Sequence, residues 1–482
     1  MGAQRIIPLD LVGSSKFERY SRISSEDTFN LYESGGALVN QAGYQAVLRI
    51  ESQSVGRATY YSPKLGEIIC VVGLSVYLVN PNLSRVLVGQ LENPTGTCSI
   101  AENNNDEIAI CDGINIFVLN YDADTFTKAP IDFNAGYVSF HDGYFVASVT
   151  ATNRWRLSSI NDGLSWPLTP NTDGVMQSSA DTCQAVVRFQ NSLYVFGTNI
   201  TEVWRDAGNP VFPYSRDNNM LIEYGCLNTE TIAQGFGLMC WLGFNNVSGP
   251  SIMVSNGGPP ERISTDGITY LLDTLKNPSD SFATIREEDG HILYAISFVS
   301  DNLSFLYDFT TKAFFSTTDH NMNYLPIRSV VRFENTHWFL SKNNGMLYEL
   351  STTIPYMSDL VDGPQFTVPR IRITKPYRQP NGQPFAINEL NITLDQGTDN
   401  QNSYYFNGQK NEQITGTVQL SFSKDGGHTY SDPVDHRLNE VGNRKSRVQF
   451  HRLGWANDIC FQVRYNSSSR CAIIGGTITI ED

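Results

Sequence analysis

Histidine and cysteine are the residues of this 482-residue chain best suited to acid–base catalysis, nucleophilic attack or metal binding. The seven histidines lie at positions 141, 291, 320, 337, 428, 436 and 451, and no two have the H-E-x-x-H spacing of a zinc site. The eight cysteines include no C-x-x-C pair, so we expect reduced core thiols. His141 and His291 adjoin Asp-Gly turns and are expected to be solvated. The sequence therefore predicts no metal site, no cofactor and no catalytic residue.

Two short segments share a hairpin-turn pattern of serine, an Asx residue, glycine, a hydroxyl residue and an aromatic residue. They are Ser159-x-Asn161-x-Gly163-x-Ser165-Trp166 and Ser423-x-Asp425-x-Gly427-x-Thr429-Tyr430. In such a turn the Asx side chain can accept hydrogen bonds from backbone N–H groups, and glycine tolerates the left-handed conformation. Both segments resemble the Asp box of sialidases and other β-proteins. The resemblance implies structural turns and no particular chemistry.

A sialidase-like glycosidase is the alternative enzyme interpretation. It would draw on these turns and on Arg5-Ile6-Ile7-Pro8, which is similar to the Arg-Ile-Pro segment of that family but has an additional isoleucine. Such an enzyme also needs an arginine cluster and a Tyr/Glu nucleophile pair, and 23 tyrosines prevent the assignment of that pair from sequence. Carboxylate pairs for other glycosidases are equally undetermined. We therefore predict a protein that is not an enzyme.

A local basic cluster is the remaining candidate site. Its members are Arg444, Lys445, Arg447, His451 and Arg452. On a strand, Arg447 and His451 would share one face with Gln449, and Arg452 would share the other with Val448 and Phe450. The cluster is either a solvated loop leading into an ordinary strand or a basic patch that meets an acidic neighbour, such as another subunit. We treat its members as candidate partner or subunit contacts.

A repeat organises the chain from about residue 60 to residue 353. A strand, a tight turn and a second strand recur seven times, with turns at positions 73, 113, 143, 191, 237, 290 and 335. Gly, Asn and Asp-Gly at the turns, flanked by Val, Ile, Tyr and Phe, are typical of half-buried hairpins. The mean interval of about 44 residues is the period of four-stranded β-propeller blades, which hairpins of a sandwich rarely keep. The 30-residue interval after position 113 suggests one short blade, and the 53-residue interval after position 237 suggests an insertion.

The predicted fold class is all-β, with three parts. Residues 1–57 form an N-terminal segment packing on the propeller or on the C-terminal domain, and residues 58–353 form a β-propeller of about seven blade-like repeats. Residues 354–482 form a C-terminal antiparallel β-sandwich-like domain, because about six strand-like segments alternate there with turn residues. Helical signal is limited to a turn or two near residues 269–275 and 356–361.

Charge supports the second boundary and excludes one class of function. Residues 1–353 contain 21 basic and 36 acidic residues, whereas residues 354–482 contain 13 of each. The net charge of −15 makes a surface that grips nucleic acid through its phosphates a poor interpretation. No apolar segment is long enough to span a membrane, and the first residues lack a signal peptide's apolar stretch, so we expect synthesis in a cytoplasm.

The C-terminal residues carry a family resemblance. The hairpin Asp425-Gly426 with Tyr430, the basic strand at Arg447 and the segment Phe461 to Arg464 resemble the C-terminal end of packaged-DNA stabilisation proteins. These proteins are tail hub or nozzle subunits, also described as tail accessory factors, of short-tailed lambdoid phages. Residues 17–37 are similar to the family's opening segment. In the family a Trp commonly follows the basic strand, whereas Gln449 occupies that place here.

The resemblance implies a structural virion protein made late in the host cytoplasm. Such subunits assemble as a homo-oligomeric ring, hexameric in the family, below the portal and its adaptor. The ring extends the DNA channel, retains the packaged genome and allows its ejection, and its other partners are the tail needle and tailspike. DNA would pass through without specific binding, which suits an acidic wall. A third interpretation is a carbohydrate-binding propeller module, for which six Trp and 23 Tyr leave room.

Overall fold

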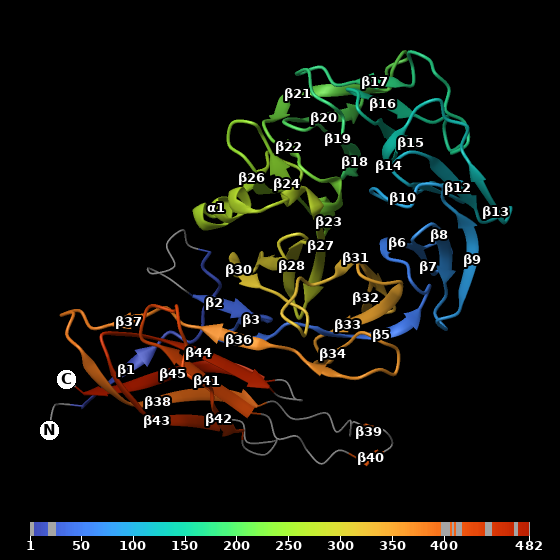
Figure 1. Ribbon diagram of the computed structural model, residues 1–482. Coiled ribbons are helices and arrows are strands. Elements are labelled where there is room, and N and C mark those ends of the chain that lie inside the picture. Colours follow the sequence, from blue (N-terminus) through green and yellow to red (C-terminus); the bar gives the residue numbers. More distant parts are fainter. Residues whose placement is uncertain are drawn as a thin grey trace.

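The computed structural model describes residues 4–17, 26–396, 405–406, 409–410, 417–438, 446–466 and 471–481. Figure 1 shows a ring of small sheets, which is a β-propeller, and a two-sheet β-sandwich beside it. The predicted all-β fold class is therefore confirmed. In these ranges the helices are α1 (Asp266–Thr274) and the 3-10 turns η1 (Thr229–Thr231) and η2 (Pro278–Asp280). None of them is long and apolar enough to cross a membrane.

Seven sheet units, or blades, surround the propeller axis among the described residues. Blade 1 contains β6 (Gly56–Ser62), β7 (Glu67–Val72), β8 (Ser75–Val79) and β9 (Arg85–Gln90). Blade 2 contains β10 (Ser99–Glu102), β11 (Glu107–Cys111), β12 (Ile116–Asn120) and β13 (Thr125–Lys128). Blade 3 contains β14 (Ala135–His141), β15 (Tyr144–Val149), β16 (Arg154–Leu157) and β17 (Asp173–Val175). Blade 4 contains β18 (Ala185–Phe189), β19 (Ser192–Phe196), β20 (Thr201–Asp206) and β21 (Tyr214–Ile222).

The last three blades are less regular. Blade 5 contains β22 (Gly225–Cys226), β23 (Ala233–Gly235), β24 (Leu238–Phe244), β25 (Ser251–Ser255) and β26 (Glu261–Arg262). Blade 6 contains β27 (Ser281–Glu288), β28 (His291–Phe298), β29 (Leu303–Asp308) and β30 (Ala313–Ser316). Blade 7 contains β31 (Ile327–Phe333), β32 (Thr336–Ser341) and β33 (Met346–Ser351), and its outer strand is β5 (Gly43–Arg49), from the N-terminal part of the chain.

The hairpin turns explain the spacing of the repeat. Asp142 and Gly143 have φ of 46° and 87°, the positive values that a two-residue hairpin turn requires. The turn at Gly113 joins the second and third strands of blade 2, whereas the turn at Gly143 joins the first and second strands of blade 3. The 30-residue interval is therefore short mainly because the two turns join different strand pairs of their blades. The prediction of one short blade overstated the difference in blade length. The long interval after Gly237 contains α1.

Strand β5 closes the ring, because it pairs antiparallel with β33 and so completes blade 7. Its other edge pairs in parallel with β34 (Tyr356–Ser358), which in turn pairs with β35 (Phe366–Thr367). A side chain at Gly43 would meet the carbonyl oxygens of Ile354 and Tyr356 at 2.3 and 2.4 Å, so only glycine allows this close approach. The helical signal near residues 356–361 was wrong, since strand pairing with β5 prevails there.

The sandwich is built from the two ends of the chain. One sheet has the order β3 (Leu31–Ser34), β4 (Ala37–Asn40), β45 (Cys471–Glu481), β38 (Phe385–Gln396) and β43 (Ser446–Ala456), and β1 (Gln4–Leu9) pairs with β45. The facing strands are β36 (Arg370–Ile373), β44 (Asp458–Asn466), β41 (Thr417–Ser423) and β42 (Val434–Arg437), and β37 (Tyr377–Arg378) pairs with β44. The short strands β39 (Tyr405–Phe406) and β40 (Gln409–Lys410) pair with each other. Alternate apolar residues of the two sheets, such as Leu390, Ile478 and Val463, form the core between them.

Propeller and sandwich share one continuous sheet. The outer strand of blade 6, β30, pairs in parallel with β2 (Asp27–Phe29) at Phe29 and Ser316. Strand β2 also pairs antiparallel with β36, so the sheet continues through β44 and β41 to β42. In Figure 1, β2 and β36 lie between the sandwich and β30. The chain thus joins its two domains by backbone hydrogen bonds as well as by side-chain packing.

Candidate functional site

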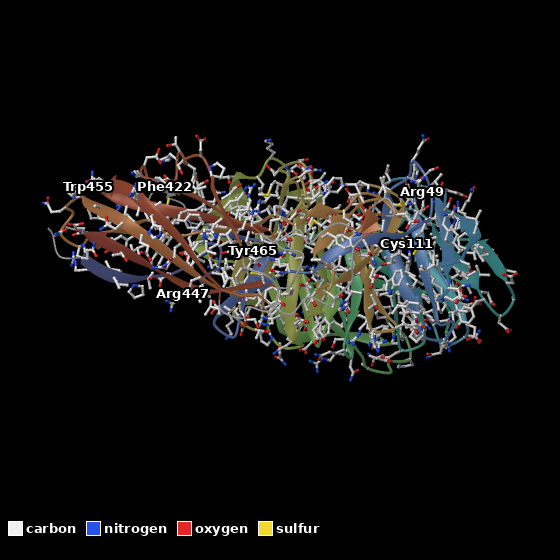
Figure 2. All side chains as sticks on the ribbon, turned by 90° about the horizontal axis from the view of Figure 1, so that it is seen from below. Arg49, Cys111, Phe422, Arg447, Trp455 and Tyr465 are labelled. Carbon is white, nitrogen blue, oxygen red and sulfur yellow. The ribbon has the colours of Figure 1, made fainter. Side chains whose placement is uncertain are left out.

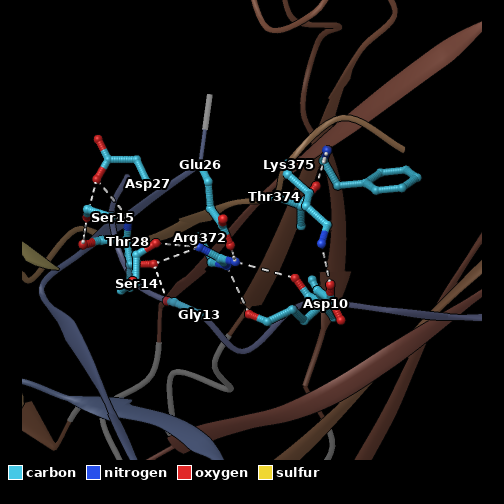
Figure 3. A network of polar contacts seen from close by, with 12 residues as sticks. Asp10, Gly13, Ser14, Ser15, Glu26, Asp27, Thr28, Arg372, Thr374 and Lys375 are labelled. Atoms are coloured by element: carbon cyan, nitrogen blue, oxygen red, sulfur yellow. Dashed lines mark hydrogen bonds and ion pairs between the residues drawn. The ribbon is translucent and has the colours of Figure 1, made fainter. Parts of the chain in front are cut away.

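A buried arginine organises the joint between the domains. Arg372 on β36 has no exposed surface, and its guanidinium forms an ion pair with Glu26. Its Nε donates to the carbonyl oxygen of Leu11 and its Nη1 to Thr28 Oγ1, each at 3.0 Å. Figure 3 shows Glu26 and Thr28, both from the N-terminal segment, beside Arg372. Because a buried charge is tolerated only when it is paired and hydrogen-bonded, this network fixes the described residues around Leu11 and around Glu26 against the sandwich.

A second charged residue, the half-buried Asp27, lies beside the arginine. Asp27 accepts hydrogen bonds from Ser15 Oγ at 2.5 Å and from Ser316 Oγ, on the outer strand of blade 6, at 2.7 Å. Burial raises the pKa of the Asp27 carboxyl above its usual value, while these hydrogen bonds oppose the shift. The nearby pair of Lys375 and Asp10, 2.7 Å apart, is largely exposed and adds little. Together Arg372 and Asp27 tie the N-terminal segment to the sandwich and the propeller.

The two turn histidines are buried, so the expectation that they are solvated was wrong. His291 begins β28 with its ring facing inward against Tyr32, and the two ring centroids are 4.7 Å apart. His141 ends β14, and its Nδ1 lies 3.0 Å from the hydroxyl of Tyr214. Burial lowers the pKa of His141 below its usual value. The side chains of both histidines point into the blades, although an Asp-Gly turn follows His141 and another precedes His291.

His291 also links two other polar residues in a geometry known from serine hydrolases. Its Nδ1 lies 2.8 Å from Asp308 Oδ2, and its Nε2 lies 3.0 Å from Ser34 Oγ. A nucleophile, a base and an orienting carboxylate need these contacts, but they also need a site for the substrate. None of the three residues lines the described cavity of the molecule. The contacts instead hold the β3–β4 hairpin against blade 6.

The described cavity lies at the propeller axis and has a volume of about 220 Å³. Inner strands of several blades line it, and η1 bounds it, with Thr229 Oγ1 donating to Thr97 Oγ1 at 3.1 Å. On η1, Glu230 pairs with Arg328 at 3.3 Å and with Lys342 at 3.4 Å. Duplex DNA, whose major groove alone is about 12 Å wide, cannot occupy such a space.

The basic cluster is only partly within the described residues, since Arg444 and Lys445 lie outside them. Arg447 and His451 are exposed on β43, as the alternation predicts, and Figure 2 shows Arg447 on the sandwich. His451 Nδ1 lies 3.7 Å from Glu389 Oε2 on the neighbouring strand. Arg452 does not share the buried face of the strand. It has φ of 58° at a β-bulge and is exposed, and Leu453 turns inward in its place.

The two hairpin-turn motifs differ in their hydrogen bonds. In the first, Ser159 Oγ lies 2.8 Å from Ser165 Oγ and Trp166 Nε1 donates to the carbonyl oxygen of Gly163 at 2.8 Å. Here the side chain of Asp162, and not that of Asn161, accepts a backbone hydrogen bond, from the N–H of Leu164 at 3.0 Å. Asn161 instead supplies the left-handed position, with φ of 51°.

In the second motif Asp425 has the expected role. Its Oδ1 accepts from the N–H of Thr429 at 3.0 Å, and the hydroxyl groups of Ser423 and Thr429 each donate to its carboxylate at 2.6 Å. These hydrogen bonds hold the pKa of the Asp425 carboxyl below its usual range, and the hydrogen bond from Ser423 has the largest effect. Gly427 donates its N–H to Ser423 Oγ, and the Tyr430 hydroxyl lies 3.7 Å from Cys460 Sγ. The turn joins the end of β41 to the rest of the sandwich.

Sequence reasoning missed the Arg372 network. The alternation of Arg370 and Arg372 with two isoleucines is typical of a strand with both arginines on one face, but it indicates no partner for them. The hydrogen-bond and ion-pair partners of Arg372 all come from the N-terminal segment: Asp10, Leu11, Ser14, Glu26 and Thr28. No group of three or more His, Cys, Asp or Glu side chains suited to a metal ion occurs in the part of the chain that the structure describes. All eight cysteines are buried thiols, as expected.

Comparisons with known proteins cover both domains. Residues 28–355 match the family described as "Bacteriophage P22 Gp10, beta-propeller" and residues 370–481 match "Bacteriophage P22 Gp10, beta-sandwich". No curated protein is significantly similar in sequence.

Several solved structures are similar to the chain at low sequence identity. A streptogramin B lyase structure is 10% identical with a TM-score of 0.44, covering 64% of this chain and 98% of that chain. Virginiamycin B lyase from Staphylococcus aureus is 9% identical with a TM-score of 0.45, covering 64% and 99%. The extracellular domain of the putative one component system BT4673 from B. thetaiotaomicron is 12% identical with a TM-score of 0.43, covering 83% and 48%.

Proposed function

The chain belongs to the bacteriophage P22 Gp10 family of phage stabilisation proteins, through its propeller and its sandwich alike, and from this we propose its place in the virion. It is a structural subunit of a short tail, forming a ring below the portal and its adaptor. The ring extends the DNA channel, retains the packaged genome and opens for ejection. The observation that carries this proposal is the family match over both domains.

The distribution of net charge along the chain and the small size of the axial cavity support a channel formed between subunits. The propeller axis holds a cavity of about 220 Å³, so DNA would run along the outer surfaces of several subunits and not through one propeller. Residues 1–353 carry the entire net charge of −15. An acidic wall repels the phosphate backbone, whereas each cationic contact would add affinity and friction through counterion release. Lysines replacing several channel-facing acidic residues should slow ejection in vitro, and unchanged kinetics would count against this arrangement.

The exposed basic residues of the sandwich are the proposed partner contacts. Arg447 and His451 project from β43 into solvent, and Trp455, near the end of the same strand, is 61% exposed. Large aromatic and arginine side chains are the residues that most often anchor protein interfaces. A portal–adaptor surface or a neighbouring subunit would cover them in the assembled tail.

Genome retention is the decisive test. Purified protein is mixed with DNA-filled heads that lack it, and DNA release is followed with a dye that does not enter intact heads. Release should stop once the protein has docked. Continued leakage from heads that carry bound protein would refute the retention role, and the absence of binding would refute the position below the portal. Turnover of a fluorogenic sialoside would instead favour a glycosidase.

A further inference from the structure

The cavity at the propeller axis contains a buried cation whose hydrogen bonding is incomplete. Arg328, on the innermost strand of blade 7, is 7% exposed, and its Nη2 lies 3.3 Å from Glu230 Oε1. Its Nε is also buried and has no hydrogen-bond partner among the described residues. Because buried N–H donors in proteins are nearly always paired, such an atom indicates an acceptor that the chain itself does not supply. Arg328 lines the cavity, so the cavity is the place where that acceptor can lie.

Hydroxyl groups form much of the cavity wall. They come from the innermost strands β6, β10, β27 and β31, which face the centre of the ring in Figure 1, from the segment before β10 and from η1. The serine and threonine residues of the wall are Thr59, Thr97, Ser99, Thr229, Thr284 and Ser329. A hydroxyl group can donate to an anion even while it accepts another hydrogen bond, as Thr97 Oγ1 does from Thr229. The wall can therefore donate to one ligand from several sides.

The charged groups at this cavity favour an anion. Arg328 and Glu230 are the charged residues of its wall. Glu230 also pairs with Lys342, whose Nζ lies 3.4 Å from Glu230 Oε2. Two cations thus share one carboxylate, and one positive charge is left without a partner in this group. Because electrostatic interactions are stronger away from bulk water, an anion in the cavity would be attracted to that charge, although the propeller as a whole is acidic.

The volume of the cavity limits the size of the ligand. It is about 220 Å³, which is space for about seven water molecules at about 30 Å³ each. Pockets for larger organic ligands usually have volumes of about 300–1,000 Å³. The planar guanidinium group of arginine matches the oxygen atoms of phosphate, and a tetrahedral oxyanion can accept from donors on several sides. Inorganic phosphate or a small phosphate ester therefore fits the cavity, whereas a nucleotide is too large.

We propose that the axial cavity binds a small phosphate anion, held by Arg328 and by hydroxyl groups such as those of Thr97 and Thr284. The anion would bridge innermost strands of blades 1, 2, 6 and 7, and among these are the first and last blades of the ring. A ligand that binds only the folded state stabilises it, so occupancy of this site would strengthen the closed propeller. The site is separate from the sandwich and does not depend on the proposed place of the protein in a tail.

Equilibrium dialysis of the purified full chain against radiolabelled inorganic phosphate, in a buffer otherwise free of phosphate, tests the site. One phosphate per chain should bind, and glycerol 3-phosphate should displace it, whereas AMP should not. Arg328→Gln should weaken binding at least about tenfold, because hydrogen bonds between charged groups are among the stronger ones. Thr284→Val removes one hydroxyl group and keeps every charge, and should weaken binding about three- to tenfold. Arg332→Gln, at an exposed position of the same strand as Arg328, is the matched control and should bind like the wild type.

Several results would overturn the proposal. Absence of phosphate binding by the wild type would leave the cavity as a space for water. Unchanged binding in both Arg328→Gln and Thr284→Val, or displacement of phosphate by AMP, would place the anion elsewhere on the molecule. An equal loss in Arg332→Gln would indicate a general effect of surface charge. Thermal unfolding of each variant checks its folding, and phosphate should raise the Tm of the wild type and not that of Arg328→Gln. If Arg328→Gln does not fold, Thr284→Val decides the question.

Discussion

Arg372 and Glu26 form a buried ion pair across 346 residues of sequence. The pair joins the strand that follows the propeller to the segment that precedes it, and both side chains are almost fully withdrawn from solvent. The stability of the joint therefore depends on keeping both partners.

Replacement of Arg372 by Met should destabilise the protein strongly. The change leaves the Glu26 carboxylate and three backbone carbonyl groups without their donor, and loss of one partner of a buried pair costs about 3–5 kcal/mol. Urea denaturation followed by tryptophan fluorescence measures the change in the free energy of unfolding. Lys375→Met, which breaks the exposed pair with Asp10, is the control and should cost less than about 1 kcal/mol. Equal losses in the free energy of unfolding for both variants would show that the buried network contributes no more to stability than the exposed pair.

Stability should fall as the pH is lowered from 7.5 to 5.5, with a contribution from His141. Burial lowers the pKa of His141 in the folded state, so the unfolded chain binds the proton more readily. The penalty is absent above the unfolded pKa of about 6.5 and grows as the pH falls below it. Urea midpoints at both pH values should show a smaller loss for His141→Gln than for the wild type. His451→Gln, at an exposed position, should retain the wild-type loss.

Ser34 should not behave as a catalytic nucleophile. Although its hydroxyl lies 3.0 Å from His291 Nε2, the contact holds a hairpin, and a fluorophosphonate probe should leave Ser34 unmodified. Peptide mass spectrometry detects the adduct. Ser34→Ala should cost about 0.5–1.5 kcal/mol through the lost hydrogen bond. A stoichiometric adduct in the wild type that disappears in this variant would assign an acyl-transfer activity to the protein.

Arg447→Glu should weaken docking onto portal–adaptor particles. Arg447 is exposed on the proposed contact surface, and reversal of a charge at an interface mainly slows association, so the effect should shrink at high salt. Binding of labelled protein to the particles at low and physiological ionic strength measures it. Lys424→Glu, a reversal on another strand end of the sandwich, provides the control. Unchanged docking of the Arg447 variant would leave the cluster as a solvated strand end.

The eight cysteines should be unreactive in the folded protein. All are buried, and burial raises the pKa of the Cys98 and Cys226 thiols to about 12, so little thiolate forms at neutral pH. Titration with a thiol-reactive chromophore should give almost no signal under native conditions and eight equivalents in guanidinium. Rapid native labelling of one thiol would indicate local opening of its blade.

The propeller could be predicted from the sequence because its signals are local. Turns such as Asp142-Gly143 and alternation within strands depend on neighbouring residues, and both recur at the blade period. The place of each turn within its blade was harder to predict, since a hairpin turn does not reveal whether it joins the first and second strands of a blade or the second and third. That ambiguity explains the apparent short blade after Gly113.

The contacts at the joint between the domains could not be predicted from the sequence, because they are long-range. Nothing near Arg372 in the sequence indicates Glu26 or Thr28 as a partner, and the burial of His291 depends on packing by Tyr32 from the N-terminal segment. The bulge that exposes Arg452 arises from pairing with β38, about 65 residues earlier, which strand periodicity alone cannot represent.

The sheet that runs from β27 through β30 and β2 to β42 has a mechanical consequence. Force applied to the sandwich reaches blade 6 through successive rows of backbone hydrogen bonds, which must break together when strands are sheared. A flexible linker would instead extend first and let the domains separate. In the proposed tail ring, a subunit built in this way would bear load as a single stiff part, and deformation would be concentrated at the proposed contacts between subunits.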